Sequence, residues 1–118
     1  MNSPEAKPTT VASTEPDRRR HPRYTVQVQI ELRQDGSDVP MRLVTTDLSR
    51  GGCYIQMQMQ LPLAVRVQAT LWLDACPIVV RGVVVTRHPQ FGNGIMFVEF
   101  EGQGEQLLTR YLGAITTS

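Results

Sequence analysis

Two short clusters of side chains in this sequence have the chemistry to bind a small anion. Residues 18–23 read Arg-Arg-Arg-His-Pro-Arg, and residues 47–52 read Asp-Leu-Ser-Arg-Gly-Gly. Guanidinium groups pair with phosphate oxygens and with the O6/N7 edge of guanine. A carboxylate accepts hydrogen bonds from guanine N–H groups, and a hydroxyl beside glycines suits a phosphate. Together, on a strand-rich scaffold, the two clusters predict a receptor site for a guanine nucleotide.

The residue types within these clusters favour guanine over adenine. Residues 18–23 contain four arginines and no lysine, and arginine, unlike lysine, pairs bidentately with phosphate and guanine. Asp47 adds discrimination because adenine has no N1–H to donate, and a good base contact is worth about 1–3 kcal/mol. Taken alone, the arginine run also fits a solvated basic edge or a patch for an RNA or DNA backbone. Asp47 and Ser49 alone also fit an ordinary turn.

Length and charge limit the class of protein. The chain has 118 residues, of which 41% are hydrophobic, and this is enough for one compact core. The formal net charge is +1, so no global field draws the protein toward nucleic acid. Residues 1–17 contain no apolar h-region, and no run approaches the ~18 apolar residues of a membrane span. We therefore expect a cytoplasmic protein without membrane insertion, and a disordered lead-in over residues 1–16.

The cysteines and histidines predict neither catalysis nor metal binding. Cys53 and Cys76 form no C-x-x-C pair and lie in apolar strand patterns, so we expect two buried free thiols. His21 and His88 have no second ligand at metal-binding spacing. Because no Cys/His or Ser/His/Asp arrangement is present, we expect neither an enzyme nor a resident cofactor or metal.

Period-two alternation of apolar and polar residues dominates the chain after the arginine cluster. Strands are expected at residues 25–32, 41–48, 53–61, 65–74, 78–87 and 95–100. Turn signals at residues 34–37, 75–77 and 90–94 separate some of them, and Gly82 inside one strand predicts a bulge.

The pattern changes to helical spacing near the C-terminal end, where apolar residues recur every three or four positions at residues 107–115. About six short strands followed by a helix predict an all-β domain, because closing the sheet removes exposed edges. The expected architecture over residues 17–115 is a six-stranded antiparallel β-barrel with a C-terminal α-helix at about 103–115. The helix is expected to cover one mouth of the barrel.

In their order and spacing, the two clusters resemble the PilZ domain, the bacterial cyclic di-GMP receptor family. Its first motif, R-R-x-x-x-R, is matched by Arg-Arg at 18–19 and Arg23, and its second, D/N-x-S-x-x-G, is matched within residues 47–52. A glycine-apolar-x-Phe pattern on the last strand is matched at residues 94–97. The resemblance covers residues 17–113 and implies a split-barrel fold and ligand-controlled regulation with no chemical step.

The resemblance also implies roles for the arginines. Arg19 and Arg23 would hold guanine edges and phosphates and, on ordering over the nucleotide, change a surface that an unidentified effector protein binds. Arg18 is the position associated in this family with an intercalated pair of ligands, which implies two cyclic di-GMP molecules per chain. Arg20 falls at a variable position and is an additional candidate.

The second motif supplies the remaining candidate residues. The resemblance assigns Asp47 to the guanine N1–H and exocyclic amine, and Ser49 to a phosphate. Gly51 and Gly52 would let the backbone approach the base closely. Trp72, on the polar side of its strand, is an additional candidate as a platform for ligand or partner.

Two other functions remain open at this point. A small barrel that binds single-stranded nucleic acid would need aromatic side chains on its wet faces and widely spread cations. Only 6% of this chain is aromatic, and its wet faces carry glutamines instead. A protein-interaction module with an idle ligand site is the third reading, and the completeness of both motifs counts against it.

Overall fold

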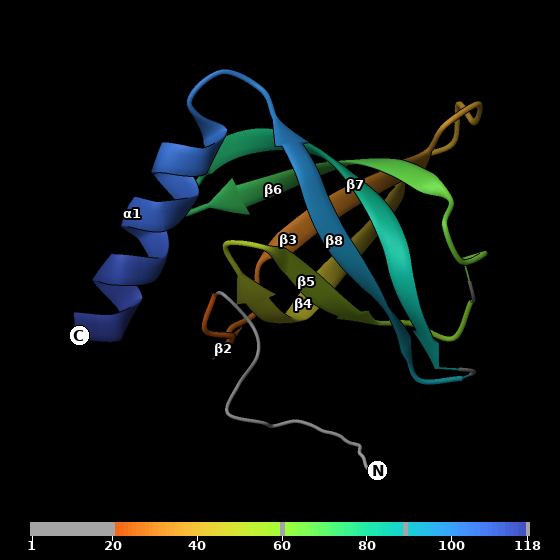
Figure 1. Ribbon diagram of the computed structural model, residues 1–118, viewed down its shortest axis with the longest axis horizontal. Coiled ribbons are helices and arrows are strands. Elements are labelled where there is room, and N and C mark those ends of the chain that lie inside the picture. Colours follow the sequence, from red (N-terminus) through yellow and green to blue (C-terminus); the bar gives the residue numbers. More distant parts are fainter. Residues whose placement is uncertain (1–20, 60, 89, 118) are drawn as a thin grey trace, which may run out of the picture.

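The computed structural model describes residues 21–59, 61–88 and 90–117 (Figure 1). Seven strands and one helix form in this part of the chain. Their bounds are β2 Tyr24–Thr25, β3 Gln29–Gln34, β4 Met41–Ser49, β5 Gly52–Gln56, β6 Arg66–Leu73, β7 Cys76–His88, β8 Gly92–Phe100 and α1 Gly104–Thr117. The predicted lead-in over residues 1–16 lies outside the described residues.

The strands close into a barrel. Antiparallel neighbours run β4-β3-β6-β7-β8-β5, and β5 pairs again with β4, so the six strands form a complete ring. The short strand β2 is an extra element that pairs with β4 beyond the end of β3. Closure satisfies the backbone groups that an open sheet would expose at its edges. The predicted six-stranded antiparallel barrel with a C-terminal helix is confirmed.

Alternation along each strand fills the barrel interior with aliphatic side chains. Ile30, Leu32, Val67, Leu71 and Val80 are each at most 1% exposed and form the centre of the core. Polar residues that alternate with them face solvent, as expected for a sheet with one buried face.

Helix α1 covers one end of the barrel (Figure 1). Leu108 and Leu112 are buried in the core, and further apolar side chains on the same face pack beside them. The helix begins close to the sheet, since a Cβ on Gly104 would lie 3.3 Å from Phe100. The prediction of a helix at about 103–115 is confirmed to within two residues.

The expected continuous strand over residues 25–32 is wrong, because the chain is broken between β2 and β3. The buried Thr45 hydroxyl donates to the Val26 carbonyl at 2.9 Å and accepts from the Val28 amide at 3.0 Å. A side chain on β4 therefore replaces part of the strand ladder. This break redirects the preceding residues so that Thr25 pairs with Asp47.

The expected turn over residues 90–94 is present but shorter, since it occupies Gln90 and Phe91 and β8 already begins at Gly92. Gly92 and Gly94 are ladder residues that leave room for neighbours. A Cβ on Gly92 would overlap the Ile55 carbonyl oxygen, and a Cβ on Gly94 would lie 3.0 Å from Thr86. Asn93 is fully buried, and its side chain holds the segment that follows β5, accepting from the Leu61 amide at 3.2 Å.

Three smaller expectations have mixed outcomes. The predicted bulge at Gly82 is confirmed by a register shift between Arg81 and Gly82. Cys53 is buried as expected, but Cys76 is exposed. Cys76 lies at the start of β7 after a two-residue turn, Asp74-Ala75, whose residues have positive φ. The turn is therefore tighter than the expected 75–77 turn and places Cys76 at the tip of a hairpin.

The candidate ligand-binding site

A pocket of about 660 Å³ opens on the outside of the barrel, where β4, β5, β7 and β8 lie side by side. It is lined by His21, Arg23, Asp47, Ser49, Gly51, Gly52, Cys53, Tyr54, Val85, Thr86, His88, Gly94, Ile95, Met96 and Phe97. A volume of this size is within the range of small-molecule sites, about 300–1,000 Å³.

The pocket brings together all the predicted motif residues that the structure describes. Arg23 arrives from the segment before β2, and Asp47 and Ser49 lie on the end of β4. Gly51 and Gly52 lead into β5. Arg18, Arg19 and Arg20 lie outside the described residues, so their roles stay predictions.

The pairing of β2 with β4 brings Arg23 to the side of the pocket where Asp47 lies. Thr25 lies opposite Asp47 in the ladder, and its hydroxyl donates to Asp47 Oδ1 at 3.4 Å. The exposed Arg23 is two residues before Thr25. A guanidinium and a carboxylate therefore approach one pocket from neighbouring strands, although they are 24 positions apart in sequence.

The Ser49 hydroxyl organises the turn between β4 and β5. Its Oγ accepts from the Gly51 amide at 3.1 Å and lies 3.4 Å from the Gly52 carbonyl, to which it donates. Ser49 therefore stabilises a turn, which is one of the two roles that the sequence allowed for it. It is compatible with ligand binding, because a hydroxyl oxygen has two lone pairs and a rotatable proton.

The two motif glycines have structural reasons of their own. A Cβ on Gly52 would overlap the Ile95 carbonyl oxygen of β8, and a Cβ on Gly51 would lie 3.0 Å from the His21 ring. Gly52 is thus required for β5 to pair closely with β8. The close approach expected between this backbone and a base remains a prediction.

These observations agree with a comparison against known families. The model of the PilZ domain family matches residues 17–114. The chain belongs to the PilZ domain family. Membership supports a cyclic di-GMP-binding regulatory role at the level of the family. No curated protein sequence matches the chain.

Solved structures share the fold of this PilZ domain. The Bacillus subtilis inhibitor of motility, MotI/DgrA, is similar with a TM-score of 0.73 and 13% identity over 86% of this chain. This chain spans 52% of that protein. The PilZ domain of CeSA from a cellulose-synthesizing bacterium has a TM-score of 0.62 and 20% identity over 80% of this chain and 97% of its own. At these identities the likeness shows the fold alone.

Sequence reasoning missed several residues that line the pocket of this PilZ domain. Tyr54 was not a candidate, yet it lines the pocket and its hydroxyl lies 2.8 Å from His88 Nδ1. His21 and His88 were considered only as metal ligands, and both line the pocket. Val85 and Met96 add an apolar wall. Only the register between β5, β7 and β8 reveals these neighbours.

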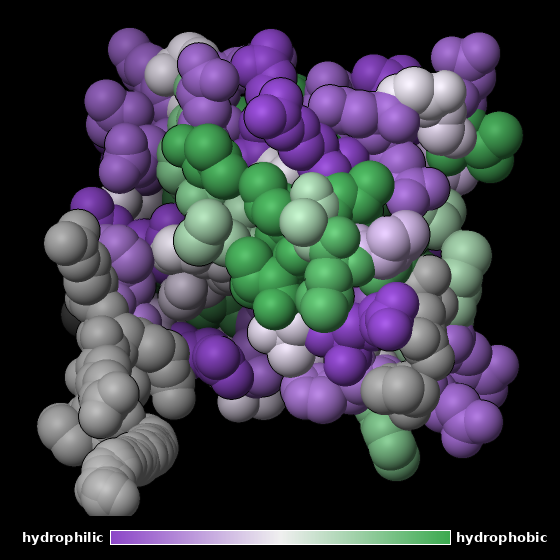
Figure 2. Space-filling model, turned by 45° about the vertical axis from the view of Figure 1, so that its right-hand side comes forward, coloured by the Kyte–Doolittle hydropathy of each residue, from purple (hydrophilic) through white to green (hydrophobic). Residues whose placement is uncertain are grey.

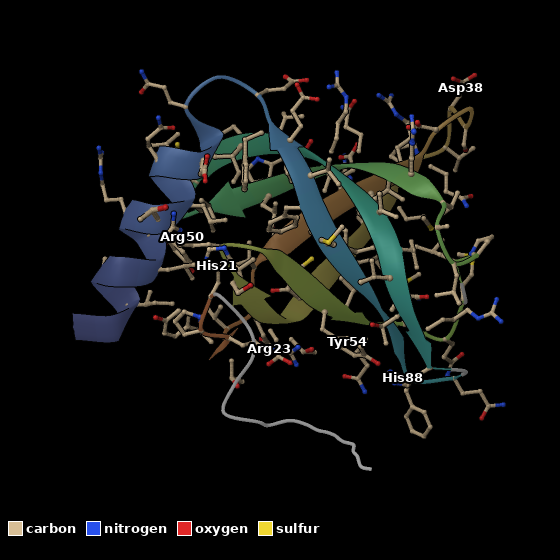
Figure 3. All side chains as sticks on the ribbon, in the orientation of Figure 1. His21, Arg23, Asp38, Arg50, Tyr54 and His88 are labelled. Carbon is tan, nitrogen blue, oxygen red and sulfur yellow. The ribbon has the colours of Figure 1, made fainter. Side chains whose placement is uncertain are left out.

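Two other residues of interest point elsewhere. Arg50, inside the second motif, lies beside α1, with its guanidinium 3.9 Å from Glu105 (Figure 3). Trp72 lies in a separate groove across β3, β4 and β6, together with Arg42 and Val44. The structure therefore does not bring Trp72 to the other candidate residues.

Cys53 is the cysteine that lines the pocket. Burial raises the pKa of the Cys53 thiol to about 12, so this sulfur is protonated and a poor nucleophile near neutral pH. Within the described residues, no group of three His, Cys, Asp or Glu side chains is arranged to hold a metal ion. The same part of the chain has no helix that is long and apolar enough to span a membrane.

Proposed function

We propose that this PilZ domain binds cyclic di-GMP in the pocket beside Asp47 and regulates a partner protein without a chemical step. The observation that carries the proposal is the convergence of Arg23, Asp47, Ser49 and the Gly51–Gly52 pair on one pocket. They come from segments separated in sequence. Each has a residue type that suits one part of a guanine dinucleotide, so their convergence is more informative than either motif alone.

Asp47 and Arg23 recognise guanine and phosphate in this proposal. One Asp47 oxygen receives the Thr25 hydroxyl, and the carboxylate has further lone pairs to accept from guanine N1–H and the exocyclic amine. Arg23 is exposed and has no ion-pair partner among the described residues. Its guanidinium can therefore pair with phosphate or with guanine O6/N7 without breaking an existing contact.

The arginines at 18–20 complete the proposed site. They directly precede the described pocket residue His21, so the chain connection keeps them within reach of a nucleotide bound there. We propose that Arg19 contacts the ligand with Arg23, and that Arg18 supports a second, stacked ligand molecule. Arg20 is an additional contact in this proposal.

Ligand binding would also change the surface around the pocket. Val85 and Met96 line the pocket and are 49% and 47% exposed. Apolar side chains gather at the centre of the face formed by β7 and β8 (Figure 2), and the 61% exposed Val98 lies on this strand pair. A nucleotide in the pocket covers part of this face and adds two negative charges beside it. We propose that an effector protein in the cytoplasm distinguishes the surface of the nucleotide-free protein from that of the nucleotide-bound protein.

Isothermal titration calorimetry with cyclic di-GMP, cyclic di-AMP and GTP tests the proposal. We expect micromolar or tighter binding of cyclic di-GMP, weaker binding of the other two, and a stoichiometry of two. Arg19→Ala and Arg23→Ala should each lose at least tenfold in affinity, since a charged hydrogen bond contributes about 1.5–3 kcal/mol. Arg33→Ala is the matched control, because Arg33 lines a different depression around the 34–38 turn.

The outcome separates the candidate functions. Equal heats for the wild type and both arginine variants would overturn the proposed mechanism. No heat with any nucleotide would favour a ligand-free interaction module. Binding of random oligonucleotides that weakens steeply with salt would favour the single-stranded nucleic acid reading.

A further inference from the structure

The Tyr54 side chain lies across strand β8 on the outside of the barrel. In the ladder, Tyr54 on β5 is opposite Gly94 on β8, and Gly94 is opposite Thr86 on β7. Two residues further along β8, Gly92 is opposite His88. The tyrosine hydroxyl lies 2.8 Å from His88 Nδ1, so the ring reaches from β5 over β8 to β7.

The two glycines of β8 form the floor on which this ring lies. A Cβ on Gly92 would lie 2.8 Å from Tyr54 Cε2, and a Cβ on Gly94 would lie 3.8 Å from Tyr54 Cδ1. Any side chain at Gly92 would therefore push the ring outward. The ring therefore lies over the backbone of β8, and Tyr54 is partly exposed and lines the pocket.

His88 holds the ring in this position. The ring centroids of Tyr54 and His88 are 5.8 Å apart and their planes are tilted by 45°, so the contact joins the ring edges through the hydrogen bond. Both residues line the pocket, and Figure 3 shows them together near the end of β7. The Tyr54 ring packs on the β8 backbone and its hydroxyl is hydrogen-bonded to His88. It therefore loses little further conformational freedom when a ligand stacks on it.

We propose that Tyr54 is a stacking platform for one guanine of the bound nucleotide, and that His88 is its positioning residue. The inference rests on the proposed function. It assigns a base-binding role to a residue outside both the arginine motif at residues 18–23 and the second motif at residues 47–52. A purine offers a flat face to an aromatic ring, and removal of such a stack typically weakens binding by about 1–3 kcal/mol. At 1.36 kcal/mol per tenfold change, this is about a 5- to 150-fold loss in affinity.

The experiment compares Tyr54→Phe with Tyr54→Leu. Phenylalanine retains the ring and loses the hydrogen bond to His88, so we expect at most a few-fold loss in cyclic di-GMP affinity. Leucine retains an apolar contact with the glycine floor and loses the aromatic face, so its affinity should fall by about 5- to 150-fold. His88→Ala should resemble Tyr54→Phe. Trp72→Leu, which removes an aromatic ring from the other groove, is the matched control and should bind as the wild type does.

A spectroscopic readout makes the test independent of folding. In the wild-type complex, a guanine H8 proton of cyclic di-GMP should shift upfield and show a nuclear Overhauser effect to the Tyr54 ring protons. The upfield shift should persist in Tyr54→Phe and disappear in Tyr54→Leu. If Tyr54→Leu does not fold, the presence or absence of the nuclear Overhauser effect between guanine H8 and Tyr54 in the wild-type complex decides whether Tyr54 is the platform.

The results distinguish this inference from the receptor proposal. Tight binding by the wild type, with unchanged affinity in Tyr54→Leu and no contact between guanine H8 and Tyr54, would overturn the platform and leave the receptor proposal intact. Failure of the wild type to bind cyclic di-GMP would overturn both.

Discussion

Two turns in this barrel carry nearly the same residue types. The turn between β4 and β5, with its flanking strand ends at residues 47–52, has Asp, Ser, Arg and two Gly, and the turn after β3, with its flanking residues at 33–38, has Arg, two Asp, Gly and Ser. Even the serine hydrogen bonds match: Ser49 Oγ accepts from the amide two residues later at 3.1 Å, and Ser37 Oγ does the same at 3.2 Å.

The surroundings of the two turns differ. The first opens on a pocket of about 660 Å³ with an apolar and aromatic wall from β7 and β8. The second borders a depression of about 360 Å³ lined only by polar residues and Gly36. Acidic, hydroxyl and basic groups thus make a candidate nucleotide site only where a neighbouring sheet supplies flat apolar faces for the bases. Matched substitutions in the two turns test this difference.

Glycine substitution should give the largest difference. Gly52→Ala forces a Cβ into the Ile95 carbonyl oxygen, so overpacking at the β5–β8 pairing should cost about 3 kcal/mol or more of unfolding free energy. Gly36 has φ +86° with open space around it, and Gly36→Ala should cost only about 1–2 kcal/mol. Urea unfolding followed by Trp72 fluorescence measures both. Equal losses would show that the first turn is no more tightly joined to the barrel than the second.

Aspartate substitution should separate the turns in binding. Asp47→Asn places an amide NH₂ where an acceptor for guanine N–H groups is needed, so cyclic di-GMP affinity should fall roughly 10- to 100-fold. Asp35→Asn, in the other turn, should leave affinity unchanged. Calorimetric titration measures both, and the ratio of cyclic di-GMP to cyclic di-AMP affinity should fall only for Asp47→Asn. A similar small effect of both variants would remove Asp47 from the site.

Serine substitution sharpens the comparison because the two turn bonds are alike. Ser49→Ala and Ser37→Ala should each lose about 1 kcal/mol of unfolding free energy from the bond that Oγ accepts, and Ser49→Ala should lose slightly more because its hydroxyl also donates to the Gly52 carbonyl. Only Ser49→Ala should also weaken cyclic di-GMP binding, by about fivefold, through the lost phosphate contact. Parallel unfolding and binding measurements reveal whether the stability effects are similar while the affinities diverge. Equal affinity of the two variants for cyclic di-GMP would contradict the assignment of Ser49 to a phosphate.

The last prediction, which has no effect at neutral pH, concerns Cys53, directly after the first turn. Burial raises the pKa of this thiol from 9.0 to about 12. Between these values the unfolded chain has lost the proton that the folded chain keeps, so unfolding free energy should fall as pH rises above 9. Cys53→Ala should remove this contribution, and Cys76→Ala, at an exposed hairpin, should not. The same slope in all three proteins would show that the thiol is not protected by the barrel.

Much of the fold was predictable because most inward positions of a strand are apolar when the sheet encloses a core. Alternation therefore marked β4, β6 and β7, and helical spacing marked α1. The break between β2 and β3 was not predictable, since it depends on the hydroxyl of Thr45 from another strand. Glycines at 92 and 94 were interpreted as a turn. Glycine occurs both where the backbone has positive φ and where a neighbouring strand approaches closely, and the sequence does not distinguish these two cases.

The same division applies to the candidate site. Arg23, Asp47, Ser49 and the two glycines were identified from residue chemistry and spacing, and the pocket contains all of them. Tyr54 and His88 were not identified, because they lie 34 positions apart and meet only through a third strand. Trp72 was a candidate because it is aromatic and partly exposed, but it lies on β6 in a different groove.

By itself, the sequence determined the residue types that can recognise guanine and phosphate, the strands and the helix, and the family. Only the tertiary structure decided which of these residues share a pocket and which aromatic ring faces it. The physical reason is that side-chain chemistry and period-two burial are local properties. The register between β5, β8 and β7 instead depends on hydrogen bonds and close packing between residues far apart in the chain.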